Sequence, residues 1–378
     1  MKFKINRDYF GAGLQLVTNV VGSRKTMPIL QNVLIEARSN KILLTTTNLD
    51  LGVRCSIQAE VTEEGSTTLP VKELSRIVKE LADIEVSVES SDKLKSTVST
   101  RGSVFNLIGI DSKEFPPLPE LEKSEVINLK KEDLAKMLKS VSYAQSVNEE
   151  RYMLKGVFFL LEKGKLSLVA TDGRRLAVSC KQVPEEDLQG EFILPSLTVS
   201  EIEKLPKTGE DIRLSFTDRQ VSFELPVSEE KSKETGFVDS IYFISKVVEG
   251  KYPNYKQVIP KDDFKVAKIE RELMQECVTR ASLVSDERIT LRVKNGEMEI
   301  SGQSMLGDAC ESLSINYDGD ESIVSFNPKF LMDPLRAIHV DQISFEFRDD
   351  MSPGVFKVSS NNENPTETLC VVMPIRTD

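Results

Sequence analysis

The stretch ATDGRRLAVSC, residues 170–180, places an acid, a glycine and two arginines between runs of small apolar residues. Asp172 could be a catalytic carboxylate, which together with Asn48 and Asp50 would imitate a two-metal site. It could also be a turn residue beside a surface that binds a partner. Asp-Gly after a strand is first of all a turn signal, because glycine accepts a positive φ and Asp hydrogen-bonds to the local backbone.

The other residues that could do chemistry form no catalytic set. His339 is the single histidine, so no second histidine can share a metal ion, and we expect it to be structural. The phosphate-loop pattern GxxxxGK[ST] is missing, since GSRKT (22–26) lacks the spacing and GAG (11–13) lies inside a predicted helix. We therefore expect a protein that is not an enzyme and that needs no metal and no cofactor.

The five cysteines follow no CxxC or CxxH spacing, which argues against structural zinc and a disulfide framework and favours a reducing compartment. We interpret them as small apolar core residues. They are Cys55, Cys180, Cys277, Cys310 and Cys370.

Length and charge limit the number of domains and the classes of partner. A chain of 378 residues predicts two or three domains. The net charge of −11 speaks against nucleic acid for the surface as a whole, although a basic stripe can lie on an acidic protein. The N-terminus has no signal-type apolar run, and no stretch reaches the length needed to cross a bilayer. We expect a soluble, cytoplasmic protein.

Three segments of the chain share one plan, which predicts internal repeats. Residues 5–21, 129–145 and 269–285 each read as an amphipathic helix followed by a pair of strands. The predicted apolar faces are Phe10, Leu14, Val17 and Val21; Leu134, Leu138 and Val141; and Leu273, Cys277 and Val284.

A second helix follows in each repeat, where Pro70, Pro195 and Asn327 occupy equivalent places. The pattern predicts three α+β domains, residues 1–124, 125–261 and 262–378, with antiparallel strands and two helices each that cover sheet faces. Two details depart from the plan. The charged run 226–236 predicts a solvated flexible loop, and Pro334 predicts that the sixth helix of the repeats is kinked or short.

Basic residues recur on the polar faces of these helices. Lys72, Arg76 and Lys79 lie opposite the apolar side of their helix, at spacings of four and three residues. Lys136 and Lys139 lie away from the apolar stripe of the third helix, as do Lys329 and Arg336 in the sixth. Polar helix faces usually carry lysines, but recurrence in three repeats favours a surface that binds phosphate. Arg280 is the weak case, because it falls near an apolar face.

Several stretches together carry a family resemblance: GSRKTMPILQNVLI (22–35), LTTTNLD (44–50), ATDGRRLA (170–177), FISKVVEGKYPNYKQVIP (243–260) and VVMPIR (371–376), after the initial MKF. With them the chain closely resembles the beta subunits of bacterial DNA polymerase III, the sliding clamps, over its full length. The resemblance implies the DNA-clamp fold: two subunits joined head to tail in a ring, sheets outside and helices lining a hole around duplex DNA. Three like units close into such a ring only if the first domain meets the third domain of a partner.

The resemblance also implies partners and positions. The partners would be a second copy, double-stranded DNA without sequence preference, the replicative polymerase, the clamp loader and other proteins with a clamp-binding motif, and no membrane. Arg24 and Asn148 would contact DNA, although the family often has glutamine where Asn148 stands. The subunit edges would pair Phe105 and Leu107 with Leu283 and Val284.

A cleft for short partner peptides would lie between the second and third domains. The family often has histidine where Arg174 stands, and this tail ends in Thr377-Asp378 instead of leucine, so peptide preference would differ. The matching positions are Leu154, Thr171, Gly173, Arg174, Arg175, Leu176, Pro253, Val258, Asn327, Val371, Val372, Met373, Pro374, Ile375 and Arg376.

The sequence thus predicts a non-enzymatic processivity clamp. The alternatives are a DNA-binding scaffold outside replication and a metal-dependent nuclease. The nuclease would require a divalent metal and would lose activity on Asp172→Asn.

Overall fold

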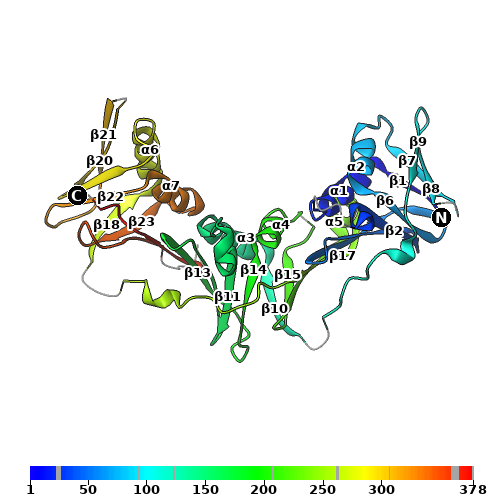
Figure 1. The fold of residues 1–378 in the computed structure, drawn as a ribbon, viewed down its shortest axis with the longest axis horizontal. Coiled ribbons are helices and arrows are strands. Elements are labelled where there is room, and N and C mark those ends of the chain that lie inside the picture. Colours follow the sequence, from blue (N-terminus) through cyan, green and yellow to red (C-terminus); the bar gives the residue numbers. More distant parts are fainter. Residues whose placement is uncertain are drawn as a thin grey trace. The chain divides into compact units, whose positions relative to one another are not determined.

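The computed structural model describes residues 1–22, 27–91, 94–121, 124–206, 208–260, 264–305, 307–358 and 366–376. Arg24, Thr377 and Asp378 lie outside them. The chain forms two compact units (Figure 1). Unit 1 comprises Met1–Glu132 and Lys204–Val247, and unit 2 comprises Asp133–Glu203 and Val248–Asp378. The central repeat is therefore divided between the two units.

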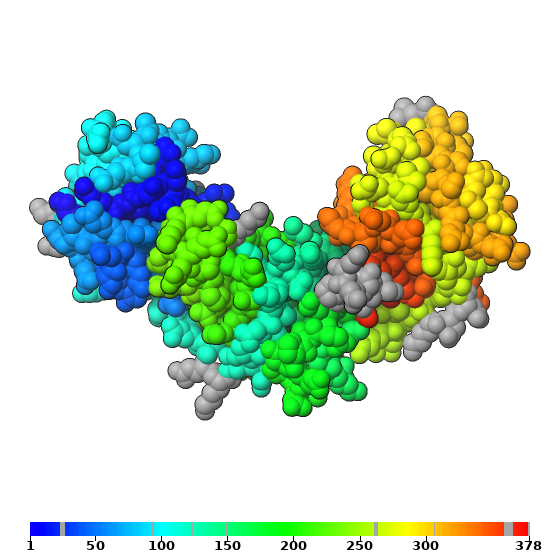
Figure 2. Space-filling view, turned by 180° about the vertical axis from the view of Figure 1, so that it is seen from behind, coloured from blue at the N-terminus to red at the C-terminus, as the bar shows by residue number. Residues whose placement is uncertain are grey.

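An eight-stranded antiparallel sheet in unit 1 joins the first repeat to part of the central repeat, in the order β10-β15-β16-β17-β4-β3-β2-β6. The two halves meet where β17 pairs with β4, with Phe243 opposite Val53. The strands are β2 (Asn32–Arg38), β3 (Lys41–Thr47), β4 (Leu51–Gln58), β6 (Gly65–Pro70), β10 (Glu125–Lys130), β15 (Asp211–Phe216), β16 (Gln220–Pro226) and β17 (Phe237–Lys246). Figure 2 shows the same junction at the surface, where light-green residues of the central repeat abut blue residues of the first.

Unit 1 also contains a five-stranded sheet in the order β5-β1-β7-β8-β9, so that β9 is an edge strand. Its strands are β1 (Lys2–Asn6), β5 (Glu60–Glu63), β7 (Glu85–Ser90), β8 (Lys95–Ser99) and β9 (Val104–Ile108). Short 3₁₀ turns η1 (Pro28–Gln31) and η2 (Ser112–Glu114) complete the connections.

The helices of unit 1 are α1 (Arg7–Thr18), α2 (Val71–Glu80) and α5 (Glu229–Thr235). Asn6 caps α1, because its side chain accepts hydrogen bonds from the backbone N–H groups of Asp8 and Tyr9. Phe10, Leu14 and Val17 are fully buried, which confirms the predicted apolar face.

The prediction of a flexible loop at 226–236 is wrong, because α5 occupies most of it. Ser228 accepts a hydrogen bond from the backbone N–H of Lys231, and Gly236 ends the helix with φ 75°. None of its residues is buried, so the sequence shows no apolar periodicity there.

Unit 2 is built around a second eight-stranded antiparallel sheet, β14-β11-β12-β13-β25-β24-β23-β18, which joins the rest of the central repeat to the third. Its strands are β11 (Gly156–Glu162), β12 (Lys165–Thr171), β13 (Arg175–Gln182), β14 (Gly190–Pro195), β18 (Lys265–Glu270), β23 (Gln342–Phe347), β24 (Gly354–Val358) and β25 (Thr366–Val372). A four-stranded sheet, β21-β20-β19-β22, consists of β19 (Ile289–Lys294), β20 (Glu297–Ser304), β21 (Gly307–Ser314) and β22 (Ser322–Phe326).

The remaining helices are α3 (Lys131–Val141), α4 (Ser196–Ile202), α6 (Arg271–Ser282) and α7 (Pro328–Ala337), and the 3₁₀ turns are η3 (Ser142–Ala144), η4 (Glu149–Leu154) and η5 (Tyr255–Gln257). Leu134, Leu138 and Val141 of α3 are buried as predicted. Helix α7 continues past Pro334 to Ala337, so this proline does not end it. No helix of the described ranges is both long enough and apolar enough to cross a membrane.

Two predictions about buried residues are wrong in part. Leu273 is exposed, and the buried face of α6 consists of Met274, Cys277, Val278 and Ala281, because the face of the helix that meets the sheet starts one residue later. Cys310 is exposed and Cys180 is half-buried, whereas the other three cysteines are buried.

Candidate functional site

The turn between β12 and β13 is fixed by Asp172. Its Oδ1 accepts hydrogen bonds from the backbone N–H groups of Arg174 at 2.9 Å and of Arg175 at 3.0 Å. The Thr171 hydroxyl accepts another from Gly173 N–H at 3.1 Å. Gly173 has φ 86°, and a Cβ there would lie 2.6 Å from Nη1 of Arg151. Asp172 is thus engaged as a turn residue.

The Arg175 guanidinium is engaged on every side. Nε donates to Asp172 Oδ2 at 3.1 Å, Nη2 donates to the carbonyl of Tyr143 at 2.6 Å, and Nη1 donates to Asp333 of α7. The guanidinium carbon also lies 5.3 Å from the ring centroid of Tyr143 and 4.7 Å from that of Phe330. Only 9% of the residue is exposed.

An apolar floor lies beside this turn. Leu176 and Val371 face each other across β13 and β25, and both are only 3% exposed. They belong to a core cluster with Phe158 and Tyr252, whose rings stack at 4.7 Å, and Leu154 packs against this cluster. Tyr252 places the connection after β17, residues 248–260, on the same cluster.

Exposed apolar groups border this floor. Val258 is 55% exposed and lies in the connection whose Tyr255 and Ile259 pack against the cluster. Met373 is 46% exposed and follows Val371, a member of the cluster, by two residues. The backbone N–H of Met373 donates to the carbonyl of Arg174 at 3.0 Å, and that of Ile375 donates to Ser325 at 2.8 Å. The turn, the connection and the C-terminal segment therefore meet at one place in unit 2.

The remaining predicted cleft positions are partly exposed and partly engaged in the fold. Asn327 caps α7, because its Oδ1 accepts a hydrogen bond from Lys329 N–H at 3.0 Å. Val372 is buried opposite Arg175, whereas Pro253 and Arg376 are exposed and Pro374 is half-buried.

Three residues of this site were missed by the sequence reasoning. Arg151 donates from Nη1 to the carbonyl of Asp172 at 3.1 Å, and Asp333 and Tyr143 bind Arg175. The only signal for Arg151 is its place in the RYML stretch after Asn148. Asp333 and Tyr143 carry no local signal, because their contacts depend on the tertiary fold.

Tyr143 and Cys370, two groups that could act as nucleophiles when deprotonated, are hydrogen-bonded to each other. The Tyr143 hydroxyl donates to Cys370 Sγ at 2.9 Å. Burial raises the pKa of Tyr143 well above its usual value and raises the pKa of Cys370 to about 12. Both groups are therefore neutral in ordinary conditions.

The other side chains considered for a metal site, those of Asn48 and Asp50, have structural partners. Asp50 pairs with Lys246 at 3.1 Å, and Asn48 accepts backbone hydrogen bonds from Asp50 and Leu51 in its own turn. Within the described ranges, no group of three or more His, Cys, Asp or Glu side chains gathers where it could hold a metal ion.

The predicted basic residues on α2, α3 and α7 are exposed. Within the part of the chain that the structure describes, they form no ion pair, in contrast to Arg280, which pairs with Glu311 at 2.8 Å. Lys79 also lines a groove of about 580 Å³ between α1 and α2, with Arg7 and Gln15. These residues are Lys72, Arg76 and Lys79 of α2, Lys136 and Lys139 of α3, and Lys329 and Arg336 of α7. Asn148 is exposed and caps η4.

The predicted subunit edges coincide with apolar exposure. In the edge strand β9, Phe105 is exposed, as are Val104 and Ile108, while Leu107 is half-buried. Leu283, directly after α6, is 78% exposed, and Val284 is half-buried. Helix α6 packs on β21, one of the two edge strands of the four-stranded sheet.

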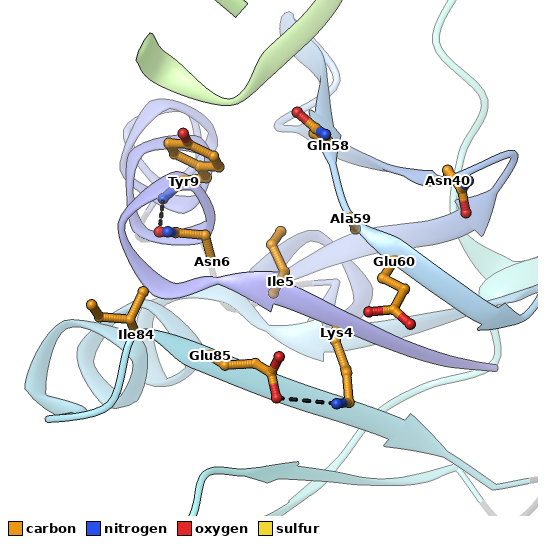
Figure 3. Close-up of a pocket in the computed structure, with 10 residues that line it drawn as sticks. All are labelled: Lys4, Ile5, Asn6, Tyr9, Asn40, Gln58, Ala59, Glu60, Ile84 and Glu85. Atoms are coloured by element: carbon orange, nitrogen blue, oxygen red, sulfur yellow. Dashed lines mark hydrogen bonds and ion pairs between the residues drawn. The ribbon is translucent and has the colours of Figure 1, made fainter. Parts of the chain in front are cut away.

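A further concavity of about 570 Å³ lies in unit 1 between β1, β5 and the start of α1 (Figure 3). Lys4 pairs there with Glu85 at 3.1 Å, and Asn6 serves as the cap of α1. Because its main polar groups are already engaged in structural roles, we assign no chemistry to it.

Comparison with known proteins identifies the family. Models for the N-terminal, central and C-terminal domains of the DNA polymerase III beta subunit match residues 1–119, 128–254 and 256–376. The chain is 31% identical to the beta sliding clamp of Staphylococcus epidermidis and 27% identical to that of Chlamydia muridarum, with 100% of this chain covered and 100% and 99% of the relatives.

Solved structures agree with this match. The DNA polymerase sliding clamp of Bacillus subtilis and a sliding clamp of Pseudomonas aeruginosa bound to griselimycin are each 26% identical, with a TM-score of 0.89 and full coverage of both chains. The fold is three tandem clamp domains of antiparallel sheets and helices. The chain belongs to the DNA polymerase III beta subunit family, the bacterial sliding clamps.

Proposed function

We propose that this protein is a sliding clamp that encircles duplex DNA and tethers the replicative polymerase to it, without catalysing a reaction itself. One observation carries the proposal: all three domain models of the family match in tandem along this chain. We place the domain boundaries near residues 124 and 261.

The exposed basic residues of α2, α3 and α7 are our candidates for the DNA-facing surface, together with Arg24 and Asn148 from the family resemblance. They can neutralise phosphates without reading bases. The overall charge of −11 disfavours DNA elsewhere on the surface. Such contacts would permit sliding, while closure around the duplex would retain the clamp.

The ring would require a second copy, joined head to tail. The sequence of β9, VFNLI, contains no charge, and its Val104, Phe105 and Ile108 side chains are exposed at a sheet edge. Isolated proteins usually protect such edges with charges or prolines, so an unprotected edge favours pairing with another chain. We propose β9 with Phe105 and Leu107 as one edge, and β21 with Leu283 and Val284 as the other.

The third surface is the peptide cleft of unit 2, where polymerases and the clamp loader would dock short segments. Met373 and Val258, which border the buried residues Leu176 and Val371, expose apolar area that a partner can cover. A thioether adapts its shape to different ligands, which suits a site with several partners.

Primer extension tests this function. A replicative polymerase on a long primed circular template, with excess unlabelled primed DNA as a trap, should make much longer products when this protein and a clamp loader are present. Bovine serum albumin at the same concentration controls for crowding. Equal product lengths with and without this protein would contradict the proposal.

A further inference from the structure

We infer that Arg175 is a positioning residue of the peptide cleft rather than a peptide ligand, and that Asp333 of α7 is the anchor through which it acts. The inference rests on the proposed cleft. It assigns to Asp333, which is not among the cleft positions implied by the family resemblance, a share in setting peptide affinity.

The first step is that Arg175 has little left to offer a ligand. Its Nε, Nη1 and Nη2 atoms donate to Asp172, Asp333 and the carbonyl of Tyr143, and its guanidinium carbon lies over the rings of Tyr143 and Phe330. Three of its five N–H groups are therefore engaged, and because only 9% of the residue is exposed, the other two offer a peptide little access.

The second step is what Arg175 holds. Asp172 accepts from the Arg175 side chain on one oxygen and from two backbone N–H groups of the turn on the other. The carbonyl of Arg174, in the same turn, accepts from the N–H of Met373. A continuous chain of hydrogen bonds therefore runs from α7 through Arg175 to the backbone that presents Met373.

The third step is electrostatic. Asp172 and Asp333 face the same guanidinium, with side chains only 20% and 19% exposed. Both carboxylates attract the guanidinium, and they repel each other. Removing the Asp333 carboxylate therefore changes the electrostatic attraction that holds Arg175 between them and against the turn. The neighbouring Arg174 is exposed and remains the arginine of this turn that a peptide can reach.

The experiment compares variants at the anchor, away from the cleft surface. Asp333→Ala removes the acceptor, whereas Asp333→Asn keeps an oxygen that can still accept from Arg175. Ile300→Ala, at a fully buried position of β20, is a control that destabilises the same unit elsewhere. A fluorescein-labelled peptide from the C-terminal tail of a replicative polymerase is titrated by fluorescence polarisation, at a temperature where circular dichroism shows every variant folded.

We expect Asp333→Ala to weaken peptide binding roughly tenfold, as for residues coupled in one network, and Asp333→Asn to restore most of the affinity. Hydrogen exchange adds a local measurement: the N–H groups of Arg174 and Arg175, now bonded to Asp172, should exchange faster in Asp333→Ala and not in Ile300→Ala.

Unchanged affinity of Asp333→Ala, or an equal loss in Ile300→Ala, would overturn the positioning role. If the wild-type protein fails to bind the peptide at all, the proposed cleft fails instead, and the two failures are therefore distinguishable.

Discussion

Met373 is the side chain that most directly reports peptide binding at the proposed cleft. Its neighbours in the floor, Leu176 and Val371, are core residues, and truncating them would cost about 2–5 kcal/mol of protein stability. Met373 is 46% exposed, so Met373→Ala removes area that a peptide would cover while leaving most of the core intact.

The magnitude follows from that exposure. Full burial of a Met side chain is worth about 1.5–3 kcal/mol, and slightly less than half of the residue remains to be covered. Met373→Ala should therefore cost roughly 0.7–1.4 kcal/mol of binding free energy, a loss of about three- to tenfold in affinity.

The assay is fluorescence polarisation with a labelled polymerase-tail peptide. Met305→Ala is the matched control, because Met305 is a fully exposed methionine directly after β20 in the same unit. We expect the control to bind as the wild type does. Equal affinity of Met373→Ala and the wild type would refute the assignment of this surface.

Three further predictions concern the subunit edges, the basic faces and the pH dependence of stability. Leu283→Asp should yield monomers in sedimentation, and it should speed labelling of the exposed thiol of Cys310 in β21, which pairing would cover; a dimer with slow labelling would argue against this edge. Replacing the three basic residues of α2 by glutamate should leave the fold intact and reduce the slope of log K against log salt by about 0.9 per lost phosphate contact, and an unchanged slope would mean that α2 does not face DNA. A hydrogen bond from Lys41 holds the pKa of Asp239 below its usual value, so its stabilisation is present above about pH 3.9, the pKa of Asp in an unfolded chain, and is lost as the pH falls through the lower folded-state pKa. Urea titrations should therefore show that the gap in unfolding free energy between wild type and Asp239→Asn narrows from pH 7 to pH 3, and a constant gap would contradict the role of this pair.

The repeats could be predicted because each helix and hairpin leaves a local pattern. Phe10, Leu14 and Val17 recur at helical spacing and are buried. The division of the central repeat between two sheets could not be predicted, since the pairing of β17 with β4 joins residues far apart in the chain. Helix α5 was missed because a helix with no buried residue has no apolar period to find.

In the candidate site, too, local features could be predicted and contacts between distant residues could not. Asp-Gly at 172–173 predicted a turn from local chemistry, and the hydrogen bonds of Asp172 confirm it. The ion pair of Arg175 with Asp333 spans 158 residues, and neither residue signals the other in the sequence. The register of α6 was misjudged by one residue at Leu273, since the alternatives Leu273 and Met274 are both apolar and only packing decides between them.

Retention on DNA of different topology tests the central claim most directly. The protein is loaded by a clamp loader onto a nicked circular plasmid and isolated by gel filtration, and the plasmid is then linearised with a restriction enzyme. A clamp held by closure around the duplex should stay on the circle and slide off the linear ends. Equal retention on circular and linear DNA would show that affinity holds the protein there, and would contradict the proposal that it encircles DNA.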